Sequence, residues 1–159
     1  MMVTTTFSVF VFAVALIVTD GSLGTGSDTG SSYSYDLSNS SDLRKLYNSK
    51  VYQAVWLTRP LEGLSFQKGI LSHSGVRVTL ADGTKWLVHK GNNFGKSSQT
   101  VVVDARHMSK SWKVKKTKNF RGSKMVSDFV KAGGANYNLL FNNCHNAAKR
   151  MMQGYTTVM

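Results

Sequence analysis

The segment Ser72–Lys90 constrains the fold most strongly, because its side chains alternate in polarity with the period of two that a half-buried β-strand requires. Val76, Val78 and Leu80 are apolar, and the residues between them are polar. The tripeptide Ala81-Asp82-Gly83 then gives a turn signal, after which a second strand-like run begins. This pattern predicts a β-hairpin.

The length of the hairpin loop decides which residues face each other. A two-residue turn would bring His89 opposite Val76 and mix a polar ring into the apolar face. A three-residue loop, Ala81–Gly83, instead pairs Val76 with Val88 and puts glycine at the left-handed position that such loops need. We therefore expect the three-residue loop. His73 and His89 then share the opposite face as diagonal neighbours, about 7–8 Å apart.

Capping and periodicity predict the other elements. Asn143 caps a helix that stops before Gly154, and its apolar face contains Cys144, Ala147, Ala148, Met151 and Met152. Further expected elements are a short helix after Ser41-Asp42, strands at Thr100–Asp104 and Trp112–Lys115, a helix at Ser123–Ala132 and an extended bridge at Tyr137–Phe141. Val51–Leu57 fits either a helix or a strand, and Pro60 ends it.

The N-terminal residues have the composition of a secretory signal peptide. Phe7–Val18 is an apolar run too short to span a bilayer comfortably, and a stretch rich in Gly and Ser follows it. We assign residues 1–20 to a signal peptide, 21–41 to a flexible Ser/Gly-rich linker and 42–159 to the folded domain. The protein is therefore expected to be secreted. An uncleaved signal anchor is the alternative.

The chain is strongly basic, with 20 Lys and Arg against 8 Asp and Glu and a formal net charge of +12. The densest basic segment comprises Lys110, Lys113, Lys115, Lys116, Lys118 and Arg121. Such a field attracts polyanions, so the expected partners are an anionic membrane surface or an acidic glycan. Nucleic acid is the least expected partner, because no nucleic-acid-binding motif accompanies the signal-type N-terminus. Solubility alone is the alternative role for this charge.

Cys144 is the single cysteine of the chain, so an intramolecular disulfide is excluded. An odd cysteine in a secreted protein indicates either intermolecular pairing or a reactive thiol. At the first turn of a helix, unpaired N–H groups stabilise a thiolate, and a nearby histidine lowers the pKa of the thiol or acts as its general base. The same amides, with Asn143 beside them, are suited to stabilising an oxyanion.

A structural role is the alternative for Cys144, because cysteine is among the most buried residue types and this one lies on an apolar helix face. His145 is not expected to be its base, since consecutive helical side chains diverge by about 100°. Metal binding is not indicated, because the sequence lacks the HxxxH and CxxC spacings of metal sites.

Two motifs together resemble the lecithin:retinol acyltransferase-like family. They are Ser72–His89 and, much later, Tyr137-Asn138-Leu139-Leu140-Phe141-Asn142-Asn143-Cys144. That family includes small phospholipase/acyltransferases and belongs to the circularly permuted papain-like superfamily, together with bacterial cell-wall peptidases. The resemblance covers roughly residues 60–154. It implies an α+β, circularly permuted papain-like fold, in which an antiparallel sheet packs against the helix that bears the nucleophile.

The resemblance also implies roles for individual residues. Cys144 would be the nucleophile, His73 the base and His89 the third polar residue that orients the base. Tyr137 and Asn143 would support the site or its oxyanion. The implied reaction is attack on an ester, with a lipid ester as the expected substrate, through an acyl-cysteine intermediate. Neither a metal nor an organic cofactor is implied.

One part of the motif departs from the family pattern. The family continues Asn-Cys with Glu-His-Phe, whereas this chain has His145-Asn146-Ala147. Two alternatives therefore stay open beside the acyltransferase or hydrolase. One is an amidase or peptidase of the same superfamily. The other is a catalytically inactive, secreted, cationic binding or structural protein that keeps the fold.

Overall fold

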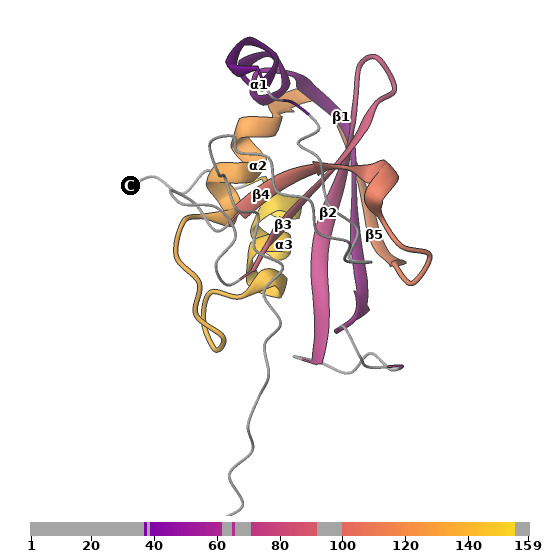
Figure 1. Ribbon diagram of the computed structural model, residues 1–159, viewed down its shortest axis with the longest axis vertical. Helices are drawn as coiled ribbons and strands as arrows, with labels where there is room; N and C mark the ends of the chain where they lie inside the picture. Colours follow the sequence, from indigo (N-terminus) through magenta and orange to yellow (C-terminus); the bar gives the residue numbers. More distant parts are fainter. Residues whose placement is uncertain (1–36, 38, 62–64, 66–70, 92–99, 155–159) are drawn as a thin grey trace, which may run out of the picture.

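The computed structural model of the chain describes residues 37, 39–61, 65, 71–91 and 100–154 (Figure 1). Its elements are α1 (Ser40–Tyr47), β1 (Lys50–Pro60), β2 (Ser72–Leu80), β3 (Lys85–Lys90), β4 (Thr100–Asp104), a 3-10 helix (Ala105–His107), β5 (Lys113–Met125), α2 (Val126–Gly133) and α3 (Cys144–Gln153). Within the described residues the fold is α+β, with a five-stranded antiparallel sheet and three α-helices. The predicted signal peptide and nearly all of the predicted linker lie outside these residues.

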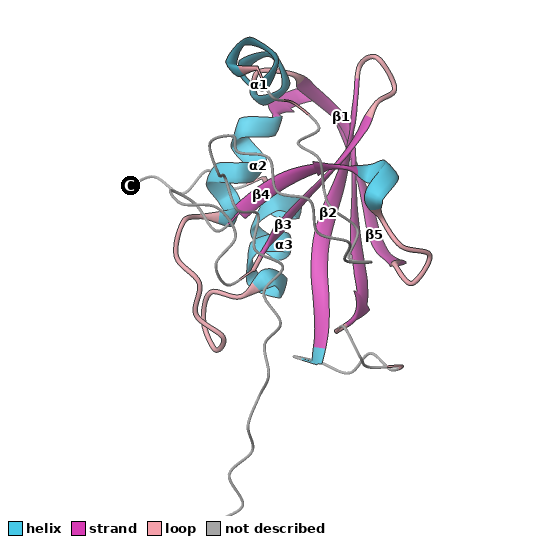
Figure 2. Cartoon of the chain, in the orientation of Figure 1, coloured by secondary structure: helices cyan, strands magenta, loops and turns pink. Residues whose placement is uncertain are grey.

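The five strands lie in the spatial order β4-β3-β2-β1-β5, and all neighbouring strands are antiparallel. β4 and β5 are therefore the edges of the sheet, while β2, which carries His73, lies at its centre. Figure 2 shows α1, α2 and α3 on one side of the sheet, with α2 and α3 side by side. In the described part of the chain, no helix is long and apolar enough to cross a membrane.

The hairpin formed by β2 and β3 has the predicted register. Val76 pairs with Val88, and the glycine in the loop has φ +83°, the left-handed conformation that the three-residue loop requires. The prediction of loop length is confirmed. Its consequence follows directly, because His73 and His89 now project from the same face of the sheet.

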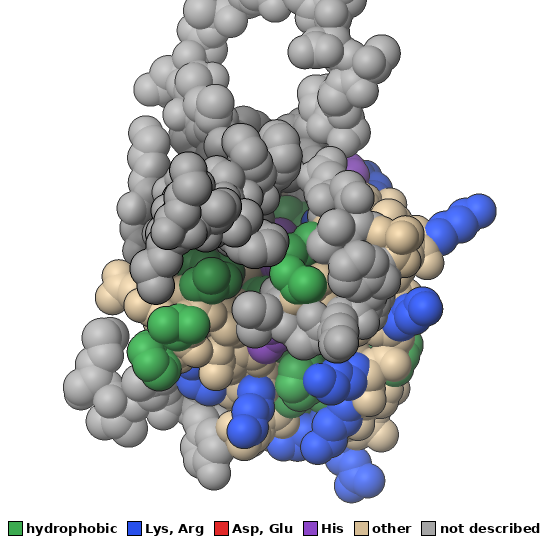
Figure 3. Space-filling view, turned by 90° about the horizontal axis from the view of Figure 1, so that it is seen from below, with side chains coloured by type: hydrophobic (Ala, Val, Ile, Leu, Met, Phe, Trp, Pro, Cys, Tyr) green, Lys and Arg blue, Asp and Glu red, His purple; other side chains and the backbone are tan. Residues whose placement is uncertain are grey.

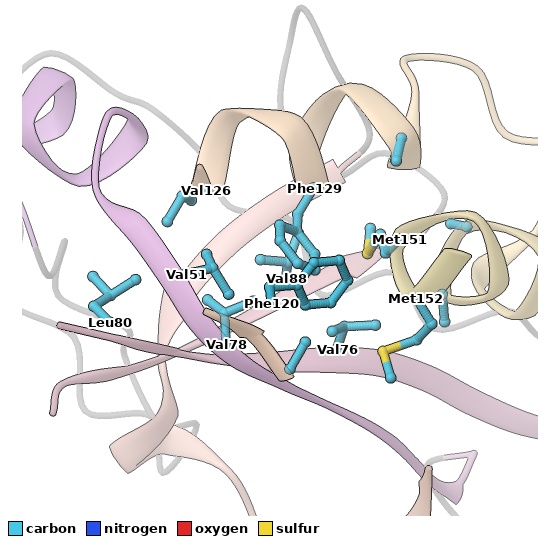
Figure 4. Close-up of a cluster of buried hydrophobic side chains, with 14 of the residues drawn as sticks. Val51, Val76, Val78, Leu80, Val88, Phe120, Val126, Phe129, Met151 and Met152 are labelled. Atoms are coloured by element: carbon cyan, nitrogen blue, oxygen red, sulfur yellow. The ribbon is translucent and has the colours of Figure 1, made fainter. Parts of the chain in front are cut away.

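The hydrophobic core lies between the helices and the other face of the same hairpin (Figure 4). Val76, Val78 and Val88 are completely buried there, and they meet Phe129 of α2 and Met151 of α3. Burying an aliphatic or aromatic side chain of this size stabilises a fold by about 1.5–3 kcal/mol. The core therefore holds α3 against the sheet and fixes the position of its first residue.

Helix α3 agrees with the prediction at both ends. The side chain of Asn143 accepts hydrogen bonds from the N–H groups of His145 and Asn146, and Gly154 ends the helix with φ +77°. The predicted apolar face is buried throughout, at Cys144, Ala147, Ala148, Met151 and Met152.

The boundary between β5 and α2 differs from the prediction. The expected strand at Trp112–Lys115 is only the beginning of β5, and the expected helix start at Ser123 is wrong. Strand pairing explains both errors, because Met125 pairs with Lys50 of β1 and extends β5 through residues with a helix-like local pattern.

Three smaller predictions are also resolved. The expected extended bridge at Tyr137–Phe141 is wrong, because this segment forms a turn closed by a β-bridge between Asn138 and Asn142. The ambiguous segment Val51–Leu57 belongs to β1, which ends at Pro60 as expected. Helix α1 begins at Ser40, inside the segment assigned to the linker, because the side chain of Asn39 caps it.

Candidate active site

Two histidines from adjacent strands contact each other on the face of the sheet opposite the core. Nε2 of His73 lies 3.0 Å from Nδ1 of His89, and the two rings are nearly perpendicular, at 85°. One ring therefore donates an N–H to the other, which fixes the orientation of the His73 ring.

Gly75 makes room for this pair. It lies opposite His89 in the hairpin, and a Cβ atom at this position would be 2.8 Å from Cδ1 of Leu87 and 3.2 Å from Cβ of His89. Trp112 covers the same place, with its ring 5.7 Å from that of His73 in an edge-on contact. A side chain larger than hydrogen at Gly75 would therefore displace one of these neighbours.

Arg59 is a further member of the site that the sequence analysis missed. It pairs with His73 across β1 and β2, and its guanidinium lies 5.5 Å from the centre of the Trp112 ring. After burial, its positive charge contributes to the lowered pKa values of His73 and His89, and it offsets part of the rise that burial causes in the pKa of Cys144. Sequence offered no signal for Arg59 and Trp112, because only strand pairing brings them to the histidines.

Burial dominates the charge state of both histidines. It is the largest cause that lowers the pKa of His89 to about 4, with the charge of Arg59 adding to it. Burial also lowers the pKa of His73 well below 6.5, followed by the effects of His89 and Arg59. Both rings are consequently neutral at neutral pH.

Cys144 is the first residue of α3 and is 6% exposed. Its thiol donates a weak hydrogen bond to the carbonyl oxygen of Ser72, at 4.0 Å. Burial raises the pKa of the thiol, and hydrogen bonds from the main-chain N–H groups of Ser74, Cys144 and His145 offset this only in part. The thiolate expected from the helix start is therefore not the resting form, which is the neutral thiol.

His73 projects from the face of the sheet opposite the core, whereas α3, which begins at Cys144, packs on the core face, so the described contacts do not bring the thiol and the proposed base together. The sulfur is hydrogen-bonded to Ser72, the residue directly before His73, and to nothing on the His73 ring among the described residues. Because both groups are neutral at rest, the described structure does not hold a preformed thiolate–imidazolium pair.

His145, which the sequence analysis does not favour as the base, is held by a separate network. Its Nδ1 lies 2.6 Å from Oγ of the fully buried Ser74, which also accepts the indole N–H of Trp56 at 3.1 Å. The Nε2 atom of His145 is buried with no hydrogen-bond partner among the described residues. The contact between His145 and Ser74 attaches the start of α3 to β2.

Asn143 and Tyr137 flank the thiol in different ways. The side-chain oxygen of Asn143 caps α3, and its amide nitrogen donates to the carbonyl of Leu139 at 2.8 Å, so the side chain supports the helix start. Burial raises the pKa of Tyr137, and the Cys144 thiol adds to this effect. The main-chain N–H of Cys144 is the remaining candidate donor to an oxyanion.

The basic segment lies on and just before the edge strand β5. Lys113, Lys116 and Arg121 are exposed, whereas Lys118 donates to the carbonyl of Met152 at 3.0 Å and so stabilises the end of α3. Lys115 lies over the Trp56 ring at 4.4 Å. Lysines along an edge strand also prevent its pairing with another chain, so this segment has a structural use besides attraction to anions.

No cluster of three or more His, Cys, Asp or Glu side chains suited to a metal ion occurs in the described part of the chain. Comparisons with protein-family models, with curated proteins and with solved structures found no match. The functional assignment therefore rests on the geometry of the two histidines and the thiol.

Proposed function

We propose that this protein is a secreted, thiol-dependent acyltransferase or hydrolase with a circularly permuted papain-like fold, and that its substrate is a lipid ester. The single observation that carries this proposal is the 3.0 Å contact between His73 and His89 beside the strand residue that holds the Cys144 thiol. The antiparallel sheet, with both histidines on its central hairpin and the thiol at a helix start, supports the finer fold assignment.

In the first step, the sulfur of Cys144 attacks the carbonyl carbon of the ester, and the thiol proton passes to Nδ1 of His73. The C–S bond forms, and the carbonyl electrons move to an oxyanion that the N–H of Cys144 stabilises. The intermediate then collapses, the C–O bond breaks, and the leaving alkoxide takes the proton from His73. The product is an acyl-cysteine, and the alcohol departs.

In the second step, an amine, an alcohol or water attacks the thioester carbonyl. His73 accepts the proton of the attacking group, and the C–S bond breaks to release the acylated product. The thiolate regains its proton from His73, which restores the neutral pair. His89 acts as a positioning residue, because its contact with Nε2 of His73 holds the orientation of that ring.

A reaction with a soluble activated ester tests this proposal. Intact-mass and peptide analysis of the full chain should reveal an acyl group on Cys144, absent in Cys144→Ser. His73→Ala should slow acylation by about 10²-fold or more, the usual contribution of a general base. His145→Ala is the matched control, because this histidine adjoins the cysteine but is bound to Ser74, and it should change the rate by less than about tenfold.

The inactive binding protein is the second candidate, and a specific observation favours it. The thiol is protonated and hydrogen-bonded to a main-chain carbonyl, and not to the base. If Cys144 accepts no acyl group from esters, thioesters or peptides under conditions that keep the protein folded, the proposal of an enzyme is contradicted and the inactive binding protein takes its place. Acylation by peptide substrates alone would identify the amidase or peptidase.

A further inference from the structure

The turn directly before the candidate nucleophile exposes three consecutive large apolar side chains. Leu139 is 43% exposed, Leu140 72% and Phe141 78%. Folded proteins in water scatter such residues singly over their surfaces, and contiguous exposed apolar groups usually mark a contact site. We call Leu139–Phe141 the apolar turn.

Hydrogen bonds hold the apolar turn in one shape. The side-chain oxygen of Asn138 accepts the N–H groups of Leu140, at 2.9 Å, and Phe141, at 3.1 Å. The main chains of Asn138 and Asn142 exchange two further hydrogen bonds, at 3.2 and 2.9 Å. The polar groups of the turn are thus bonded internally, and the apolar side chains point away from it into solvent.

Two cations attach the base of the turn to the body of the protein. The side-chain oxygen of Asn142 accepts hydrogen bonds from Lys90, at 3.1 Å, and from Arg150, at 2.8 Å. Both cations also donate to the carbonyl of Gly133, at 2.6 and 3.0 Å, and Lys90 is completely buried. The turn is therefore anchored to β3, α2 and α3 together.

The apolar turn and the thiol belong to the same end of the molecule. Asn143 bonds the carbonyl of Leu139 with one end of its side chain and caps the helix that starts at Cys144 with the other. Figure 1 shows the segment between α2 and α3 extending toward the end of the molecule where β2 begins. Viewed from that end, the described surface shows hydrophobic, Lys and Arg side chains, and no Asp or Glu side chain is visible (Figure 3).

We propose that the apolar turn inserts into the surface of an anionic phospholipid bilayer and sets the Cys144 site at the level of the lipid headgroups. Leu140 and Phe141 would enter the boundary between headgroups and acyl chains, where amphipathic elements bury apolar side chains. The Lys and Arg side chains visible at this end of the molecule and the net charge of +12 complement anionic headgroups. The choice of a bilayer over a protein partner rests on this charge complementarity and on the proposed lipid-ester function.

Vesicle flotation tests the proposal. The full chain is mixed with vesicles of phosphatidylcholine alone or with phosphatidylserine added, and the bound fraction is measured. We expect binding to the anionic vesicles and a loss of at least about tenfold in partitioning for the double variant Leu140→Ser/Phe141→Ser. Val114→Ser is the matched control, because Val114 is also highly exposed, at 63%, but lies on β5, and its variant should bind like the wild type.

Membrane docking and catalysis are separated by two further measurements. Cys144→Ser should bind vesicles like the wild type, because binding does not need the thiol. The double variant should keep its acylation by a soluble ester while losing turnover of vesicle lipid. If the wild-type protein binds anionic vesicles but Cys144 accepts no acyl group, the proposed function is contradicted, whereas the role of the apolar turn as a membrane anchor is retained.

Three results would overturn the membrane anchor. One is the absence of wild-type binding to anionic vesicles. The second is equal binding by the wild type and the double variant, which would assign attraction to the basic segment alone. The third is a wild-type protein that dimerises with increasing concentration, together with a double variant that stays monomeric but binds vesicles as the wild type does. The apolar turn would then contact a second copy of the chain and not a membrane. Circular dichroism confirms in each case that the variants are folded.

Discussion

At the residue scale, burial decides the chemistry of the site more than the helix terminus does. The pKa of the Cys144 thiol is raised although three main-chain N–H groups approach the sulfur, because the loss of water around a charge outweighs them. The same loss of water keeps His73 and His89 neutral. The proposed reaction would therefore start from a neutral histidine and a neutral thiol.

The low pKa of His89 predicts a loss of stability in acid. The unfolded chain binds a proton near the ordinary pKa of 6.5, whereas the folded chain does so only near 4, so the free energy of unfolding falls as the pH drops through this interval. Between about pH 7 and pH 5 this single group should cost about 1–2 kcal/mol. Urea unfolding should show a smaller loss for His89→Gln, and an identical loss in both proteins would contradict the low pKa.

The close approach at Gly75 predicts that Gly75→Ala impairs the site beyond its effect on stability. The added methyl group meets Leu87 and His89, which should cost about 1–3 kcal/mol and displace the His89 ring. Gly83→Ala is the matched control in the same hairpin, because it strains a residue with φ +83° but contacts nothing. Both variants should unfold more easily, and only Gly75→Ala should slow acylation of Cys144. Equal acylation rates in Gly75→Ala and Gly83→Ala would contradict the proposed role of His89 in positioning His73.

At the element scale, the sequence predicts those elements whose boundaries depend on residues close to one another in the chain. The hairpin register follows from loop chemistry and alternation, and α3 follows from Asn143, Gly154 and apolar spacing, so both were predicted correctly. The extent of β5 depends on its pairing with β1, and the approach of Arg59 to the histidines depends on the same sheet. Such non-local contacts leave no periodic signal in one sequence.

The buried lysine under the apolar turn gives a prediction about this element. Burial, followed by the charge of Arg150, lowers the pKa of Lys90 from 10.5 to about 8. Because the unfolded chain binds the proton more tightly in this interval, stability should rise by about 1–2 kcal/mol between roughly pH 8 and 9.5. The difference in unfolding free energy between the wild type and Lys90→Met isolates this effect from groups that both proteins share. A difference that does not change with pH would be evidence that Lys90 titrates normally.

At the scale of the whole molecule, three features are consistent with the proposed action at an anionic membrane surface. They are the basic charge, the signal-type N-terminus and the exposed apolar turn. If the protein is secreted as proposed, its net charge of +12 would attract it to anionic surfaces outside the cell, and the described surface in Figure 3 shows no acidic side chain. The six-residue basic segment is partly engaged in the fold, as Lys118 shows at the end of α3. Attraction to a surface is therefore expected to come from the overall charge as well as from this segment.

Secretion itself is a prediction of this account. Expression of the full sequence in cells with a secretory pathway should release a protein that lacks about the first 20 residues. N-terminal sequencing of the medium fraction checks the expectation. Retention of the intact N-terminus in the membrane fraction would favour the signal anchor.

The most direct test of the central claim is the pH profile of Cys144 alkylation by iodoacetamide in the wild type, His73→Ala and His145→Ala. If His73 accepts the thiol proton, a minor thiolate–imidazolium form gives the wild type a plateau of reactivity between the low pKa of His73 and the raised pKa of Cys144. The rate in His73→Ala should instead fall about tenfold per pH unit below the thiol pKa, while His145→Ala keeps the plateau. A single titration that is the same in all three proteins would contradict the assignment of Cys144 and His73 as nucleophile and base.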